Sequence, residues 1–177
     1  PGGVVNYVYK RPKDFARYQV QANTDSQGSY GGSIDLTGPI TEDGTLLYRA
    51  VGNYSRYEDD QNHIFSNPVS ALAALTWKPS EAFSTTFTYE YYDFESVPEQ
   101  ENNKLDSETG EFFPIPRDFY WGNLDDRAVR TTHTFIWDAE WKPSETLKVN
   151  AYANFQRSDQ WYQNTRIVGG GRGGTPT

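Results

Sequence analysis

Two stretches of the chain open with the same five residues. Residues 77–94 read WKPSEAFSTTFTYEYYDF, and residues 141–158 read WKPSETLKVNAYANFQRS. After each Trp-Lys-Pro-Ser-Glu, small or polar residues alternate with larger apolar ones, which is the pattern of a β-strand with two unlike faces. Proline cannot donate to a strand ladder, and Ser-Glu favours a turn in water. Each copy therefore predicts a tight turn between two antiparallel strands, with its Trp at a strand end.

The same period of two extends along most of the chain. Aromatic residues gather near the ends of these segments, and the apolar faces use Ala, Gly, Tyr and Trp more than Leu, Ile and Val. A soluble meander shows the same period but usually builds a dense aliphatic core. An apolar outward band between aromatic girdles, with a polar interior, is typical of a transmembrane β-barrel. The segments with this period are 15–23, 29–38, 46–56, 69–77, 83–93, 132–141 and 147–157.

The pattern predicts an all-β fold, an antiparallel up-and-down sheet of about seven strands that forms part of a transmembrane β-barrel. The turns at 41–45, 79–82 and 143–146 are expected on one rim, and the longer connections 57–68 and 95–130 on the other. A charge at Ala151 is expected to destabilise the fold by about 2–4 kcal/mol near the bilayer middle. The residues expected to face lipid are Phe87, Tyr89, Phe135, Val149 and Ala151, and those expected to face the lumen are Thr86, Thr88, Thr134, Asn150 and Tyr152.

Composition excludes several classes of function. The chain has 177 residues, no Cys, no Met and a net charge of −8, and it starts at Pro1, so we expect a piece of a longer polypeptide. Without Cys, neither a disulfide nor a thiolate metal site is possible. A nucleic-acid partner is not expected, because there is no basic patch. Residues 93–126 contain ten acidic residues against Lys104 and Arg117, so this one segment carries the whole net charge.

The sequence contains no catalytic constellation, and we expect neither an enzyme nor a bound cofactor or metal. His63 lies in an acidic loop that is expected to be solvated, although a weak cation site there is conceivable. His133 falls on the lipid-facing side of a strand, where an interfacial side chain is expected rather than a ligand. The glycine-rich run at 169–174 lacks the Lys-Ser/Thr of a phosphate-binding loop.

The first twelve residues read PGGVVNYVYKRP. This stretch resembles the end of the plug domain in TonB-dependent outer-membrane receptors of the ferric-siderophore type, with Tyr9 standing where Thr is more usual. The resemblance implies that residues 1–12 are the C-terminal end of a plug and its last strand. Residues 13–177 would then be the N-terminal part of a barrel of about 22 strands. The matching residues are Pro1, Gly2, Gly3, Val4, Val5, Asn6, Val8, Lys10, Arg11 and Pro12.

The resemblance implies a receptor in the bacterial outer membrane that imports ferric siderophores. TonB would energise it through a plug segment outside this chain, and outer-membrane lipid and lipopolysaccharide would surround it. Two alternatives stay open. One is a related receptor for another nutrient, such as a cobalamin or a sugar. The other is a secreted, aromatic-rich β-sandwich that binds carbohydrate.

The long connection supplies the candidate ligand-binding residues. Its descending part reads FFPIPRDFYWGNLDD at 112–126 and places aromatic rings beside one guanidinium. These rings could cover a siderophore, or they could pack the loop against itself. The acidic excess of the segment favours a neutral or cationic hydroxamate ligand over an anionic catecholate. The candidate ligand-binding residues are Arg117, Phe119, Tyr120 and Trp121.

Overall fold

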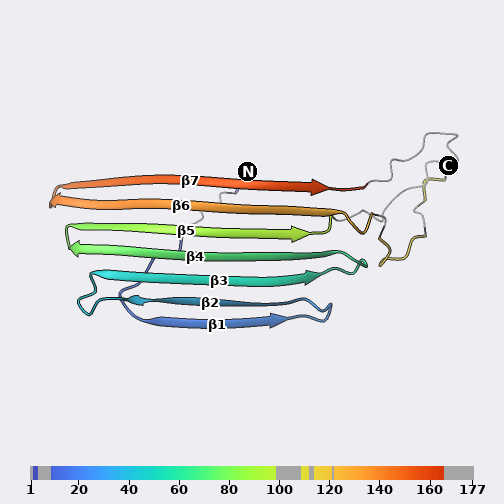
Figure 1. Ribbon diagram of the computed structural model, residues 1–177, viewed down its shortest axis with the longest axis horizontal. Coiled ribbons are helices and arrows are strands. Elements are labelled where there is room, and N and C mark those ends of the chain that lie inside the picture. Colours follow the sequence, from blue (N-terminus) through green and yellow to red (C-terminus); the bar gives the residue numbers. More distant parts are fainter. Residues whose placement is uncertain (1, 4–8, 99–108, 112–113, 121, 166–177) are drawn as a thin grey trace.

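The computed structural model describes residues 2–3, 9–98, 109–111, 114–120 and 122–165, and these form one antiparallel sheet with its loops. Neighbours in sequence are neighbours in the sheet throughout, so the predicted up-and-down meander is confirmed (Figure 1). Among the described residues there is no helix of the length and apolarity needed to cross a membrane. The strands are β1 (Arg17–Thr24), β2 (Tyr30–Pro39), β3 (Leu46–Glu58), β4 (Phe65–Ser80), β5 (Phe83–Ser96), β6 (Arg127–Ser144) and β7 (Leu147–Gln163).

Both Trp-Lys-Pro corners lie on one rim of the sheet, as predicted, and the long loops lie on the opposite rim (Figure 1). The expectation that each proline ends its strand was wrong, because β4 continues through Pro79 to Ser80 and β6 continues through Pro143 to Ser144. The pairing shifts register at these points, so each proline lies where the ladder does not need its missing N–H. The preceding lysine N–H donates to a neighbouring carbonyl 2.7 Å away in both copies, Lys78 to Thr45 and Lys142 to Ala82.

Several strands extend further toward the loop rim than the sequence pattern predicts. β4 begins at Phe65 instead of 69, β6 begins at Arg127 instead of 132, and β7 ends at Gln163 instead of 157. In these extensions both faces of the sheet carry polar or charged side chains, so the alternation that marks a half-apolar strand is absent. Backbone pairing continues the strands there, together with polar contacts such as that of Thr131 with Asp93.

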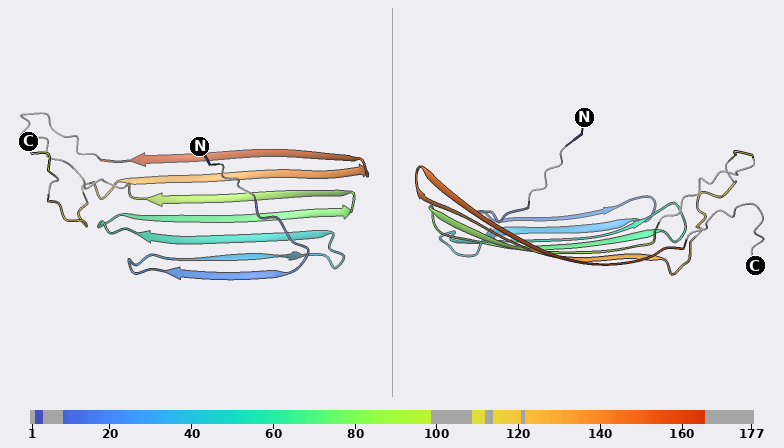
Figure 2. Two further views of the ribbon diagram at one scale, coloured as in Figure 1. Left: turned by 180° about the vertical axis from the view of Figure 1, so that it is seen from behind. Right: turned by 90° about the horizontal axis from the view of Figure 1, so that it is seen from above.

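The sheet is curved, and the segment before β1 crosses its concave face (Figure 2). Lys10 lies 2.9 Å from Asp35 on β2, and Arg11 lies 2.7 Å from Asp138 on β6. Their partners belong to the polar set of each strand, so the concave face is the predicted lumen side. The last plug strand expected within residues 1–12 stays a prediction: residues 9–12 form no strand, and Pro1 and residues 4–8 lie outside the described part.

On the inner strands exposure differs between the two faces, whereas the edge strand β7 is exposed on both, and Tyr152, expected in the lumen, is 63% exposed. Phe87 on the convex face is 60% exposed, whereas its neighbour Thr86 on the concave face is 3% exposed. The concave threonines pair across strands, as in the 2.9 Å hydrogen bond between the hydroxyls of Thr76 and Thr86. Curvature brings the concave side chains together and spreads the convex ones apart. The convex apolar side chains are therefore exposed, as expected for a surface that contacts an apolar solvent.

The convex face carries an uncharged band. On β6 it runs from Trp141 to His133, which are eight residues apart, or roughly 26 Å along the strand. A tilted strand of this length spans most of the ~25 Å apolar zone of an outer-membrane barrel. The first charge on the convex face is Arg157, which pairs with His133 at the upper edge of the band. The band therefore has the height and the chemistry of a lipid-facing belt.

The register changes the depth assigned to Ala151. This residue pairs with Ala139, two positions from the girdle residue Trp141, so it lies near the rim rather than near the bilayer middle. Ala153, which pairs with Trp137, lies at the centre of the band. The adjacent Asn154 points to the concave face, where it pairs with Ile136.

In the complete receptor, Ala153→Lys is expected to lower the free energy of unfolding by about 2–4 kcal/mol, because the ammonium would face the bilayer centre. Ala151→Lys is expected to lower it by about 0–1 kcal/mol, because the charge can reach the interface. Asn154→Lys is the matched control for the opposite face. Urea-dependent folding into lipid vesicles measures all three, and equal losses at Ala153 and Asn154 would contradict the assignment of faces.

Candidate ligand-binding site

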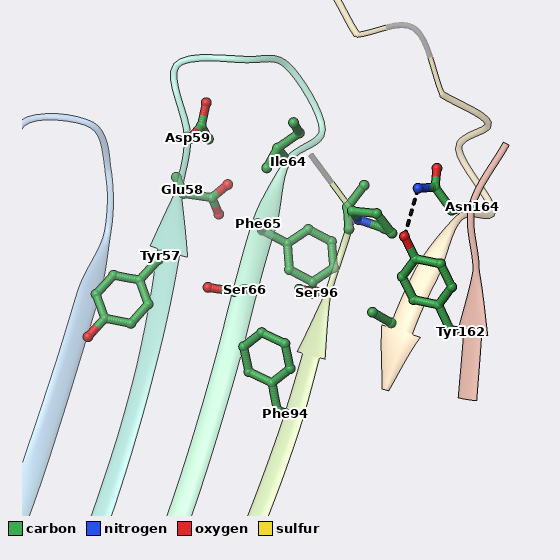
Figure 3. A pocket seen from close by; sticks show the side chains of 13 residues that line it. Tyr57, Glu58, Asp59, Ile64, Phe65, Ser66, Phe94, Ser96, Tyr162 and Asn164 are labelled. Atoms are coloured by element: carbon green, nitrogen blue, oxygen red, sulfur yellow. Dashed lines mark hydrogen bonds between the residues drawn. The ribbon is translucent and has the colours of Figure 1, made fainter. Parts of the chain in front are cut away.

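A cavity of about 520 Å³ lies at the loop-rim end of the sheet, within the size range of small-molecule sites. Its aromatic lining comes from four strands: Tyr57 on β3, Phe65 on β4, Phe94 on β5 and Tyr162 on β7 (Figure 3). Tyr57, Phe94 and Tyr162 belong to the concave set of their strands, whereas Phe65 belongs to the convex set and lies under Arg56 and Arg127. Most of the aromatic lining therefore lies on the face that the segment before β1 crosses.

Small residues between the rings make the cavity. Ser66 pairs with both Tyr57 and Ser96, and Ala128 pairs with both Ser96 and Tyr162, so one row across the sheet has three small side chains between two tyrosines. The side chain of Asn164 donates a 2.7 Å hydrogen bond to the Tyr162 hydroxyl, drawn as the dashed line in Figure 3. Because these rings stand on paired strands, their positions are set by the sheet rather than by a loop.

Below this row, a stack continues down the concave wall. The rings of Tyr92 and Phe94 are nearly parallel, with centroids 6.3 Å apart and an interplanar angle of 8°. The guanidinium of Arg130 lies 5.2 Å from the centroid of the Tyr92 ring, in cation–π contact. One row lower, the hydroxyls of Thr132 and Ser158 are 3.0 Å apart.

The rest of this part of the concave wall is neutral and polar. Hydroxyl and amide side chains can donate and accept hydrogen bonds to an oxygen-rich molecule without fixing its charge. Together with the flat aromatic faces, they form a surface suited to a large polar ligand with apolar parts. These neutral residues are Asn53, Ser55, Ser66, Ser70, Ser96, Thr132, Ser158 and Gln160.

The loop between β3 and β4, residues 59–64, braces the descending part of the long loop. The backbone N–H of Asn62 donates to the carbonyl of Asp118 at 2.9 Å, and its side chain donates to the Asp118 carboxylate at 3.1 Å. Arg117 pairs with Asp60. The two loops therefore hold each other beside the cavity.

None of the four residues predicted to bind ligand lines the cavity in the described part of the chain. Arg117 is engaged with Asp60, and the Tyr120 ring lies 6.4 Å from the ring of His63. Burial raises the pKa of the Tyr120 hydroxyl. Phe119 is 45% exposed, and Trp121 lies outside the described residues. A contact between these four residues and a ligand stays a prediction.

The sequence reasoning missed the cavity residues Tyr57, Phe94 and Tyr162, and Tyr92 and Arg130 on the wall below them. One signal was available: Tyr92 interrupts the polar set of its strand, although aromatic rings elsewhere favour the apolar set. An aromatic side chain on the concave face near the loop rim is placed where it can contact a ligand.

His133 lies where the sequence placed it, on the convex face. Its Nδ1 is 2.9 Å from the Tyr89 hydroxyl, and its ring packs against Tyr91 with centroids 5.3 Å apart. His63 has a φ of 70°, in the left-handed region. Within the described ranges there is no group of three or more His, Cys, Asp or Glu residues that could hold a metal ion.

Asp126 ties the base of the long loop to the chain that follows β7. Its carboxylate is fully buried and accepts hydrogen bonds from Asn123 N at 3.0 Å, Thr165 N at 2.8 Å and Thr165 Oγ1 at 3.0 Å. Burial by itself would raise the pKa of this carboxyl, but the hydrogen bonds from Thr165 and Asn123 outweigh it and lower the pKa. The charged carboxylate is therefore the form that holds the two segments together.

Comparison with curated proteins finds outer-membrane receptors, while no family model matches the chain. The ferrichrome outer membrane transporter/phage receptor of Escherichia coli K12 is 32% identical over 101 residues, which is 56% of this chain and 13% of that protein. The metal-pseudopaline receptor CntO of Pseudomonas aeruginosa is 41% identical over 49 residues, which is 28% of this chain and 7% of that protein. The chain thus spans only a small part of these relatives.

Solved structures show the same fold. The pyoverdine outer membrane receptor FpvA from Pseudomonas aeruginosa PAO1 matches with a TM-score of 0.77 at 19% identity, over 90% of this chain and 24% of that one. BauA, the ferric preacinetobactin receptor from Acinetobacter baumannii, matches with a TM-score of 0.67 at 15% identity, over 86% and 22%. The sheet thus has the fold of part of the barrel wall of these receptors, and the fold predicted from the sequence is confirmed.

Asp126→Asn is expected to loosen the base of the long loop, because an amide replaces a charged acceptor of three hydrogen bonds. The loss of about 1–3 kcal/mol should speed tryptic cleavage around Arg127 roughly tenfold or more, while β6 stays folded. Asp125→Asn, at the exposed neighbouring position, is the control. Limited proteolysis of the complete receptor measures both, and equal cleavage in the two variants would show that Asp126 does not hold the loop.

Proposed function

We propose that this chain is part of an outer-membrane receptor that binds and imports ferric siderophores. Residues 1–12 are proposed to be the C-terminal end of the plug, and residues 13–177 the N-terminal part of the barrel. The observation that carries the proposal is the aromatic and polar cavity at the loop rim. Most of its aromatic lining lies on the same concave face as the segment proposed to end the plug.

The relatives support this reading, because their names describe a ferrichrome transporter and a receptor for a metal complex. They are transport receptors, which fits binding and passage rather than catalysis. A siderophore brings its own iron, so the wall needs flat faces and hydrogen-bonding groups rather than metal ligands. The free energy for uptake is proposed to come from TonB, acting on plug residues beyond this chain.

Contacts of residues 10–13 with the concave wall support the proposed end of the plug. Arg49 binds Asp35 through two hydrogen bonds, from Nε at 2.8 Å and from Nη2 at 2.6 Å, and donates a third to the carbonyl of Arg11 at 2.9 Å. The backbone N–H of Lys13 donates to Thr37 Oγ1 at 2.9 Å. The segment is thus attached to the wall before β1 begins, as a plug-to-barrel junction requires.

Neither alternative function is favoured by a particular observation. A β-sandwich would cover the apolar face of this sheet with a second sheet, yet the described residues form one sheet whose convex band is exposed. A receptor for cobalamin or sugar would have the same barrel, so binding measurements must separate it from the favoured reading.

Phe94→Ala in the complete receptor is expected to weaken binding of a ferric siderophore roughly ten- to a hundredfold, since burying one ring contributes about 1–3 kcal/mol. Phe87→Ala removes a ring of the same size from the convex face and should leave binding unchanged. Trp121→Ala, in the same assay, tests the loop residues predicted from the sequence.

The assay is binding of iron-labelled siderophores, one hydroxamate and one catecholate, to whole cells, with surface display checked by antibody. If neither complex binds the wild-type receptor, the proposed function is wrong. If Trp121→Ala weakens binding and Phe94→Ala does not, the receptor binds its ligand at the loop and the cavity is not the site.

A further inference from the structure

Arg130 occupies a particular place on the concave wall. It pairs directly across from Phe94 on β5, and its exposed guanidinium leans over the face of Tyr92. It therefore stands beside the aromatic stack and one row below the cavity, on the route that a molecule entering from the loop rim would take.

The arginines of the described residues differ in their partners. Arg17 hydrogen-bonds the side chain of Gln19, and Arg130 has its contact with Tyr92 but no carboxylate partner. The remaining arginines in this part of the chain each pair with an acidic side chain: Arg11 with Asp138, Arg49 with Asp35, Arg56 with Glu58, Arg117 with Asp60, Arg127 with Glu95, and Arg157 with Asp159.

Among the described residues, no carboxylate pairs with Arg130. The closest acidic residue on the concave rows below it is Glu90, whose row lies four residues along β6, or roughly 13 Å away. Two acidic residues reach the rim of the cavity. Glu58 is paired with Arg56, and the Asp59 carboxylate accepts a 2.9 Å hydrogen bond from Gln61 N.

The chemistry of this arrangement selects a ligand. A guanidinium is always charged, is weakly hydrated, and presents a planar fork that matches pairs of anionic oxygens. The contact with the Tyr92 ring already restricts the Arg130 side chain, so that side chain loses less conformational entropy when a ligand binds. The nearly parallel Tyr92 and Phe94 rings present flat faces on which another aromatic ring can stack.

We propose that Arg130, supported by Tyr92, recognises a negatively charged ferric chelate whose iron-binding oxygens are carried on aromatic rings, that is, a ferric catecholate. The proposal rests on the proposed function and names its ligand class. It differs from the hydroxamate expected from the acidic loop. Among the described acidic residues of that loop, Asp118 and Asp126 are already engaged in hydrogen bonds within the loops, away from the stack.

The test uses the complete receptor on whole cells and two probes, a ferric tris(catecholate) and a neutral ferric trihydroxamate. Arg130→Gln is expected to weaken binding of the catecholate tenfold or more and to change binding of the trihydroxamate less than twofold. Arg130→Lys should restore part of the affinity, because an ammonium keeps the charge but lacks the fork. Arg157→Gln removes a convex-face arginine and should leave both affinities unchanged.

Salt gives a second readout. Catecholate binding to the wild type should weaken as ionic strength rises, and binding to the Arg130→Gln variant should depend much less on salt. If the receptor prefers the trihydroxamate, or if Arg130→Gln leaves catecholate binding unchanged, the proposal for Arg130 is wrong while siderophore binding stands. If the wild type binds neither probe, both proposals fail.

Discussion

The unbroken register of the sheet decides what every side chain contacts. Through β1, β2 and β3 the pairing keeps one offset for each pair of strands, and between β4 and β7 it shifts only at the two Trp-Lys-Pro corners. Because strand side chains alternate, one slip inside the band would exchange its uncharged residues with the polar wall. The bulges lie at the rim, beyond Trp77 and Trp141, where a shift changes no lipid contact.

This constraint explains which parts of the fold could be predicted from sequence. A strand between lipid and a polar interior must alternate, so the meander, the faces and the shared rim of the two corners follow from the residue pattern. Above the band, around Val129 and Arg127, neither face of β6 needs to be apolar. The alternation of apolar and polar residues is therefore lost, and the sequence pattern does not predict a strand there. In the sequence alone, Pro79 and Pro143 indicate strand ends, because proline cannot donate to the ladder. That they lie at bulges can be recognised only once the partner strand is known.

The candidate site was less predictable for a related reason. Tyr57, Phe94 and Tyr162 are separated by tens of residues in the sequence. Tyr57 and Tyr162 share one row only through the pairing of Ser66, Ser96 and Ala128, and Phe94 lies one row below. The aromatic residues of the long loop were easier to notice because they are consecutive. The described residues of that set, however, contact another loop, and the sequence spacing does not show this. Arg117 meets Asp60, and Tyr120 meets His63, through a loop that lies more than fifty residues earlier.

The attachment of residues 10–13 and the candidate site share one rigid support. Lys10 and Arg11 are adjacent but reach Asp35 on β2 and Asp138 on β6, so the segment is held at two places across the wall. Arg49 and Lys10 together compensate the half-buried charge of the Asp35 carboxylate, which one of them alone would do less well. A ligand on Phe94 contacts strands of this same sheet, whose continuous ladder leaves little freedom to move. In the receptor proposed here, ligand binding would therefore be transmitted to the plug through direct contact in the lumen, while the wall acts as a fixed frame.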